Sequence, residues 1–206
     1  MSKSHPILSD TPLGYSCANN QAAPVQCNTA TEYSEPGSTS CSQCPAGYSC
    51  PGSGTPVKCD EGYYSLSGAV VCTICPAGSY CSTVTASPIS LGASTTQYTL
   101  AGATYALTVQ PGYAHNGVSS EPTPCASGSF WENSNSCTLC PAGSACPDPR
   151  SAAITCPAGT YSSGTGNTEC NVCPAGSGCP GGATINACGA GSFSLGAASA
   201  CTTCPQ

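Results

Sequence analysis

The sequence is poor in aliphatic residues, in charges and in long apolar runs. Leu, Ile, Val and Phe number 23 among 206 residues, too few for a conventional hydrophobic core. Lys3, Lys58 and Arg150 are the only Lys and Arg residues, so no surface that follows a phosphate backbone can form, which excludes nucleic acid as a partner. No apolar stretch approaches the roughly 18 residues of a membrane-spanning helix, and no 3.6-residue periodicity persists. These features predict neither a membrane span nor a helical bundle.

Cysteine and turn-forming residues are abundant instead. The chain holds 20 cysteines, 24 glycines and 19 prolines, with a formal net charge of -6. Such a cysteine density is typical of a disulfide scaffold in an oxidising compartment. Residues 1–16 lack the basic and apolar regions of a signal peptide. We expect an extracellular or cell-surface protein. A virion surface is the alternative, because a virus that oxidises its structural proteins in the host cytoplasm would also fit.

The cysteines recur in a fixed order, which makes the chain a repeat protein. The string Cys-x-x-Cys-Pro-Ala-Gly occurs four times, and a fifth Cys-x-x-Cys pair ends the sequence. In each complete copy a third cysteine follows the second by six residues. A fourth cysteine comes later and precedes a Gly-x-aromatic segment that predicts a short strand. Within Cys-Pro-Ala-Gly we expect a type I turn with Pro at its second and Gly at its fourth position.

The stretch 82–124 interrupts this order with 43 residues that contain no cysteine. It is either an insertion or one repeat that has lost its cysteines. Residues 97–109 predict a hairpin that turns near Ala101-Gly102. Its strands would form a β-layer of their own or join those of a neighbouring subunit. The expected organisation is therefore a tail (1–10), cysteine-rich repeats (11–81), a Ser/Thr-rich β insertion (82–124), and further repeats (125–206), the last of them incomplete.

The repeat also predicts how the cysteines pair. Pairing cannot be deduced from sequence alone, but each copy must solve it in the same way. The simplest local solution gives two disulfides per repeat, each worth about 2–3 kcal/mol in the chain-entropy model. The expected pairs are Cys27–Cys41, Cys44–Cys50, Cys59–Cys72, Cys75–Cys81, Cys125–Cys137, Cys140–Cys146, Cys156–Cys170, Cys173–Cys179 and Cys188–Cys201. The predicted fold is an elongated rod of small disulfide-rich tandem repeats, mostly loop and short β-ribbons, with almost no helix and a β-rich insertion.

These strings resemble the ephrin-receptor-like cysteine-rich repeat over 11–81 and 125–206. They are similar, more distantly, to tumour-necrosis-factor-receptor and EGF-like modules. Such repeats occur in receptor ectodomains, in adhesion proteins and in surface fibres such as mastigonemes. The chain departs from the pattern at 82–124, at Ala30, where later copies have Gly, and at Tyr33, which comes one place late.

Two cysteines remain without a partner, one near each end. Residues 11–17 align with residues 44–50, so Cys17 corresponds to the third cysteine of a repeat. Thr11 stands where the second cysteine, its expected partner, would be. Cys204 is a second cysteine whose third would lie beyond residue 206. One interpretation is head-to-tail assembly through an intersubunit Cys204–Cys17 disulfide, which makes a filament if the contact does not close into a ring. The other is that the chain is a segment excised from a longer array.

Other candidate sites are weaker. A zinc site needs two close cysteine pairs, whereas the fourth cysteine stands alone, so we expect no metal and no cofactor. Asp60-Glu61 is the only adjacent acidic pair and favours a solvated turn rather than a calcium site. His5 and His115 suggest no catalytic arrangement. Phe130-Trp131 is either a platform for a sugar or a partner, or a pair that packs beneath 82–124.

The leading hypothesis is a structural subunit or segment of an extracellular fibre, appendage or surface coat. Its partners would be further copies of itself, neighbouring repeats of a longer chain, or other surface proteins and glycans. The alternative is a receptor or adhesion ectodomain that binds a protein or glycan. We expect no enzymatic activity. The many Ser, Thr and Pro residues also allow O-linked sugars.

Overall fold

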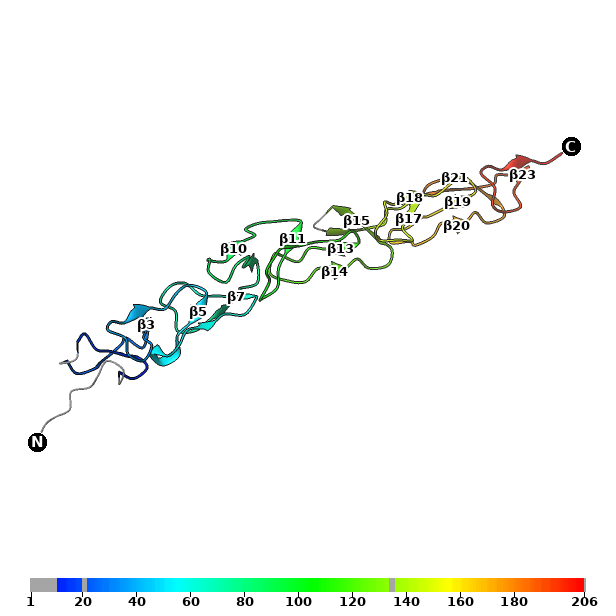
Figure 1. The fold of residues 1–206 in the computed structure, drawn as a ribbon. Coiled ribbons are helices and arrows are strands. Elements are labelled where there is room, and N and C mark those ends of the chain that lie inside the picture. The colour runs from blue at the N-terminus through cyan, green and yellow to red at the C-terminus, as the bar shows by residue number, and fades with distance from the viewer. Residues whose placement is uncertain (1–10, 20–21, 134–135, 206) are drawn as a thin grey trace, which may run out of the picture. The chain divides into compact units, whose positions relative to one another are not determined.

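The computed structural model describes residues 11–19, 22–133 and 136–205. The chain divides into two compact units, Met1–Leu107 with Gly117–Ser120 and Thr108–Asn116 with Glu121–Gln206. Both consist of short antiparallel two-stranded ribbons (Figure 1). Among the described residues the only helical element is the 3-10 turn η2 (Pro51–Ser53). The predicted disulfide-rich, almost helix-free fold of loops and ribbons is confirmed.

In the first unit each strand pairs with the next strand along the chain. The ribbons are β1 (Tyr15–Ser16) with β2 (Val25–Gln26), β3 (Glu32–Tyr33) with β4 (Ser42–Gln43), β5 (Tyr48–Ser49) with β6 (Val57–Lys58), β7 (Tyr63–Tyr64) with β8 (Thr73–Ile74), β9 (Ser79–Tyr80) with β10 (Ile89–Ser90), and β11 (Gln97–Tyr98) with β12 (Leu107–Thr108).

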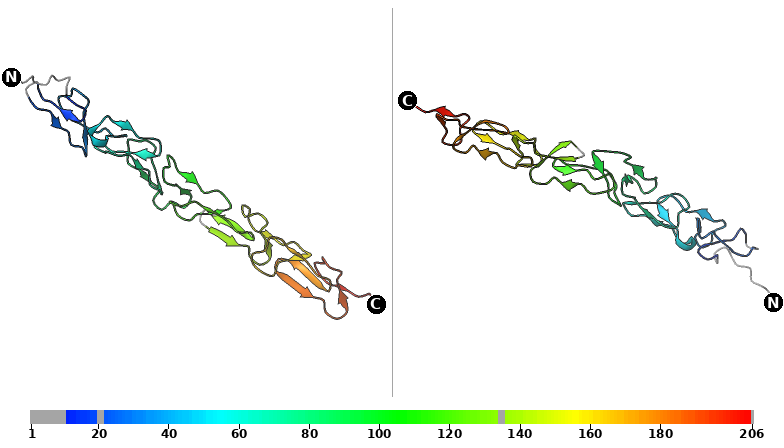
Figure 2. Two further views of the ribbon diagram at one scale, coloured as in Figure 1. Left: turned by 90° about the horizontal axis from the view of Figure 1, so that it is seen from below. Right: turned by 180° about the vertical axis from the view of Figure 1, so that it is seen from behind.

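The second unit continues the same order (Figure 2). Its ribbons are β13 (Tyr113–Ala114) with β14 (Thr123–Pro124), β15 (Ser129–Asn133) with β16 (Ser136–Leu139), β17 (Ser144–Ala145) with β18 (Ile154–Thr155), β19 (Thr160–Tyr161) with β20 (Asn171–Val172), β21 (Ser177–Gly181) with β22 (Thr184–Ala187), and β23 (Ser192–Phe193) with β24 (Thr202–Thr203).

The structural unit is half of the sequence repeat, and we call it a half-repeat. Each begins at a lead residue, such as Cys44, and in most copies makes a turn at a glycine three residues later. It then enters its first strand and reaches an inner residue, such as Cys50, usually six residues after the lead. The lead residues are Thr11, Cys27, Cys44, Cys59, Cys75, Leu91, Val109, Cys125, Cys140, Cys156, Cys173 and Cys188.

The turn at the start of a half-repeat differs from the predicted one. The amide of Tyr48 donates to the carbonyl of Pro45, so the turn begins at proline rather than at cysteine. Gly47 is its third residue and has a φ of 84°. A positive φ at that position defines a type II turn and requires glycine or asparagine. The type I prediction was therefore wrong, because proline takes the first position of the turn.

One backbone hydrogen bond joins most half-repeats to the following one. The amide of a lead residue donates to the carbonyl of the preceding turn residue at 2.8–3.0 Å, as Cys59 does to Gly47. Leu91 makes this bond to Gly78, although no cysteine is present there. Cys125 makes it to Gly112. The stretch 82–124 therefore contains two half-repeats whose lead residues are Leu91 and Val109, with β11 and β12 forming the hairpin expected in 97–109.

The core contains cysteines and small hydroxyl residues instead of a cluster of aliphatic side chains. Almost all buried apolar side chains are cysteines. Inner residues alternate between a buried cysteine and a buried Ser or Thr in most successive half-repeats, as with Cys50 and Ser65. The Ser65 hydroxyl donates to the carbonyl of Tyr48 in the preceding half-repeat at 2.7 Å. Disulfides and such hydroxyl bonds thus replace the missing hydrophobic core.

Candidate functional site

Eighteen cysteines form nine disulfides, which join the same pairs that the sequence pattern predicts. Two kinds alternate. Short-loop disulfides join the lead and inner residues of one half-repeat across six positions, as in Cys44–Cys50. Long-loop disulfides join a lead cysteine to a residue 12–14 positions later, as in Cys125–Cys137 and Cys27–Cys41. Such bonds form in an oxidising compartment, which is typical of secreted and extracellular proteins.

Cys17 and Cys204 are the free cysteines of the described residues, and their surroundings differ. Cys17 is an inner residue with 1% of its surface exposed. Its thiol lies 3.1 Å from the carbonyl oxygens of Asn19 and of Ala22, to which it donates. Cys204 is exposed. The first unit therefore holds one buried free thiol and the second unit one exposed free thiol.

Thr11 occupies the lead position of the first half-repeat, where the aligned half-repeat has Cys44. It is 2% exposed. Its carbonyl accepts a hydrogen bond from the amide of Gly37, as the carbonyl of Cys44 does from Gly68. Thr11 thus makes the backbone contact of a lead residue but cannot form a disulfide with Cys17.

Cys204 has the backbone geometry of a lead residue as well. Its amide donates to the carbonyl of Gly191 at 2.9 Å, the bond made by the other lead cysteines to the turn before them. Cys204 therefore starts a half-repeat for which only Pro205 and Gln206 remain in the sequence. The first half-repeat thus has an inner cysteine without a lead cysteine, and Cys204 is a lead cysteine without a disulfide.

The turn glycines show how closely successive half-repeats pack. A Cβ atom at Gly62 would lie 2.5 Å from the carbonyl oxygen of Gly102, and one at Gly159 would lie 2.5 Å from that of Ala197. In both cases the neighbour belongs to the second half-repeat that follows. At Gly176 and Gly191 such an atom would have no neighbour within 4 Å.

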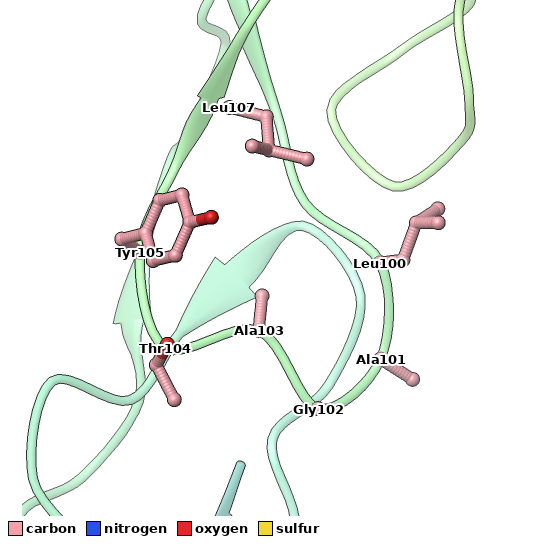
Figure 3. Close-up of a pocket in the computed structure, with 7 residues that line it drawn as sticks. All are labelled: Leu100, Ala101, Gly102, Ala103, Thr104, Tyr105 and Leu107. Atoms are coloured by element: carbon pink, nitrogen blue, oxygen red, sulfur yellow. The ribbon is translucent and has the colours of Figure 1, made fainter. Parts of the chain in front are cut away.

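The cysteine-free half-repeat that begins at Leu91 carries an open pocket of about 270 Å³. Figure 3 shows Leu100 and Tyr105 on opposite sides of this space, with Leu107 lining it from a third direction. Tyr105 is 66% exposed. The lining is mostly apolar, which makes it the candidate binding surface for a ligand with an apolar face.

The other candidate residues do not gather into a site. Phe130 and Trp131 are consecutive residues of β15 and therefore point to opposite faces of their ribbon, so they do not form one shared platform. Asp60 and Glu61 lie exposed in the turn before β7. His115 is the inner residue of a half-repeat, and His5 lies outside the described residues.

Within the described ranges no group of three or more His, Cys, Asp or Glu side chains could hold a metal ion. In the same ranges no helix is long and apolar enough to cross a membrane. No model of a known protein family matches the chain. A search of curated proteins likewise finds no match. The resemblance to ephrin-receptor-like repeats stays a prediction.

Proposed function

We propose that the chain is a structural subunit or segment of an extracellular fibre, appendage or surface coat. The observation that carries this proposal is the backbone hydrogen bond from lead residue to turn residue, which recurs at most lead residues between Cys27 and Cys204. It persists at Leu91, where no disulfide is present. A chain that repeats one backbone contact along its sequence is suited to setting a spacing.

The disulfides give such a protein its mechanical role. Short-loop and long-loop disulfides together leave few long unbridged segments that a pulling force could extend. Because repeats that contact only near neighbours unfold locally, every covalent loop limits how far a local opening spreads. Head-to-tail assembly through Cys204 and Cys17 would extend the array beyond one chain.

Electrophoresis of native material with and without reductant tests this proposal. We expect a ladder that collapses on reduction to the 20.2 kDa chain and that disappears in Cys204→Ser. Sedimentation of Cys204→Ser at high protein concentration is the second readout, because a fibre subunit should still self-associate without the covalent link. A chain that stays monomeric in both experiments contradicts the proposal.

A receptor or adhesion ectodomain is the second candidate, favoured by the pocket at Leu100, Tyr105 and Leu107. Exposed aromatic rings beside aliphatic side chains suit a sugar face or a partner side chain. Tyr105→Ala should then abolish binding in a screen against glycans and cell surfaces. Phe193→Ala is the matched control, because Phe193 is also exposed but does not line this pocket. No binding by the unchanged chain, or equal loss in both variants, contradicts this role.

A further inference from the structure

Alternate half-repeats of the first unit contact one another directly. The first, third and fifth of them, which we call the first column, begin at Thr11, Cys44 and Cys75. A Cβ atom at Gly14 would lie 3.3 Å from the Cβ atom of Ser53. One at Gly47 would lie 2.8 Å from the Cγ2 atom of Thr85. Each contact joins a half-repeat to the second one after it, so the ribbons β1–β2, β5–β6 and β9–β10 follow one another along the column.

The second strand of each ribbon in this column carries one exposed aliphatic residue. Val25 in β2, Val57 in β6 and Ile89 in β10 are 66%, 58% and 45% exposed. All three lie two positions before the next lead residue, and successive members are separated by the same interval in the sequence. Their register is also the same, because they pair with Ser16, Ser49 and Tyr80 of the first strands. We call these three side chains the apolar row.

The strands that carry the apolar row also have an open backbone edge. Each belongs to a two-stranded ribbon, so only one of its sides faces a partner strand. Among the described residues, β2, β6 and β10 make no backbone hydrogen bond outside their own ribbons. Proteins commonly protect such edges with charged residues. Lys58 is the one charged residue in these three strands, and its side chain points to the face opposite Val57, because successive side chains alternate.

The acidic residues of the first unit lie outside the first column. Those that the structure describes in this unit belong to the half-repeats beginning at Cys27 and Cys59, and they are Glu32, Glu35, Asp60 and Glu61. The described residues of the first column include no acidic side chain. Two copies can therefore bring their first columns together without placing carboxylates opposite one another, whereas the acidic half-repeats would repel their equivalents.

We propose that a second copy of the chain docks beside the first column, so that the apolar rows and the edges of β2, β6 and β10 of the two copies meet. This inference rests on the proposed fibre function and adds a lateral contact to it. An edge of two residues is too short to hold a partner alone, so several edges must bind at once. A second copy presents edges at the same interval, which is why it fits all three. Main-chain hydrogen bonds would align the copies, and burial of the apolar rows would stabilise the contact.

Sedimentation of the full chain with Cys204→Ser tests the lateral contact, because no disulfide through Cys204 can then form. We expect association that increases with protein concentration. Adding Val57→Lys and Ile89→Lys places two charges in each apolar row and should raise the dissociation constant about tenfold. Leu66→Lys with Val71→Lys is the matched control, because these side chains are 50% and 64% exposed, lie outside the first column and add the same charge. The control should associate as the Cys204→Ser chain does, and thiol titration shows whether both variants keep their disulfides.

Hydrogen exchange at low and at high protein concentration locates the contact between copies. In β2, β6 and β10 the amides that point away from their own ribbons should exchange more slowly at high concentration, because the second copy binds them. The amides of β8, which lies in a half-repeat outside the first column, should exchange at the same rate at both concentrations.

Three results would overturn the inference while leaving the proposed fibre intact. The first is equal weakening of association by the two pairs of lysine substitutions. The second is slower exchange at high concentration outside β2, β6 and β10 only. The third is an unchanged chain that forms a reducible ladder but stays monomeric as Cys204→Ser, which would leave the first column to a different protein. Absence of both the ladder and the association contradicts the inference and the fibre together.

Discussion

Two-stranded ribbons form both in the cysteine-free half-repeats, which begin at Leu91 and Val109, and in disulfide-bonded half-repeats such as those that begin at Cys140 and Cys173. Both kinds consist of a turn followed by an antiparallel two-stranded ribbon, whose second strand leads into the next half-repeat. At the lead position the cysteine-free half-repeats have aliphatic residues, and Val109 is 5% exposed. The ribbons therefore form without disulfides, which contribute stability.

The largest expected loss of stability comes from adding a methyl group at a turn glycine that another half-repeat covers. One such glycine contacts a disulfide-bonded half-repeat and the other a cysteine-free one. Gly159→Ala places a Cβ atom 2.5 Å from the carbonyl oxygen of Ala197, which lies in a loop closed by the Cys188–Cys201 disulfide. Gly62→Ala forces the same contact on Gly102, whose half-repeat has no disulfide. Left-handed strain and overpacking together should cost about 3 kcal/mol at Gly159. The cost at Gly62 should be about 1 kcal/mol smaller, because the unstapled loop shifts more easily.

Hydrogen exchange of the Ala197 amide measures the loss of stability in Gly159→Ala, and that of the Gly102 amide measures it in Gly62→Ala. Both amides donate to a lead cysteine, Ala197 to Cys173 and Gly102 to Cys75. Equal losses of protection in the two variants would mean that the disulfide does not stiffen the loop.

The next largest change in stability should come from adding a disulfide to a cysteine-free half-repeat and, in a separate variant, removing one from a disulfide-bonded half-repeat. Val109→Cys with His115→Cys places two cysteines six residues apart at a lead and an inner position, as in Cys140–Cys146. The chain-entropy model predicts a gain of about 2 kcal/mol for a loop of this size. Cys140→Ala with Cys146→Ala should lose a similar amount.

Thiol titration and exchange of two lead amides check the effect of moving the disulfide. The Cys125 amide reports on the first variant and the Cys156 amide on the second, because they donate to Gly112 and Gly143 respectively. Two free additional thiols in the first variant would show that the cysteine-free half-repeat departs from the stapled geometry.

Removing the hydroxyl group of an inner residue should destabilise a disulfide-bonded half-repeat and stabilise a cysteine-free one. The Ser65 hydroxyl donates to Tyr48, so Ser65→Ala should cost about 1 kcal/mol. The hydroxyl of Thr99, the inner residue after Leu91, is buried and makes no hydrogen bond within the described residues. Thr99→Val keeps its shape and should stabilise the protein by about 1 kcal/mol. Thermal unfolding of both variants gives the signs, and destabilisation by Thr99→Val would contradict the prediction.

The smallest effect concerns a loop residue with a positive φ. Ala197 has a φ of 52°, whereas Gly102, at the same place in the cysteine-free region, has a φ of 80°. Ala197→Gly should stabilise by less than about 1 kcal/mol, because relief of strain is partly offset by a more flexible unfolded chain. Gly102→Ala should destabilise by about 1 kcal/mol. The denaturant midpoints of the two variants test this prediction. A higher midpoint for Gly102→Ala than for the unchanged protein would contradict the strain argument.

The sequence predicts the cysteine pairing well because the repeat presents the same local problem several times. It also contains a signal for the half-repeats in 82–124, since Val109-Gln-Pro-Gly-Tyr follows the pattern of Cys44-Pro-Ala-Gly-Tyr. Our interpretation left open whether 82–124 is an insertion or a repeat without cysteines, because it followed cysteines rather than glycines. The contact between a turn and the second following half-repeat could not be predicted, because it depends on how the ribbons pack rather than on any one motif.

The spacing of the disulfides also has a consequence for biosynthesis. No disulfide of the described residues spans more than 14 positions, as in Cys27–Cys41 and Cys156–Cys170. Each pair can therefore close soon after its second cysteine leaves the ribosome or translocon, and no paired cysteine has to wait for a distant partner. Because local contacts form quickly, oxidation proceeds from the N-terminus onward with little need for isomerisation. The order of synthesis thus becomes the order of folding.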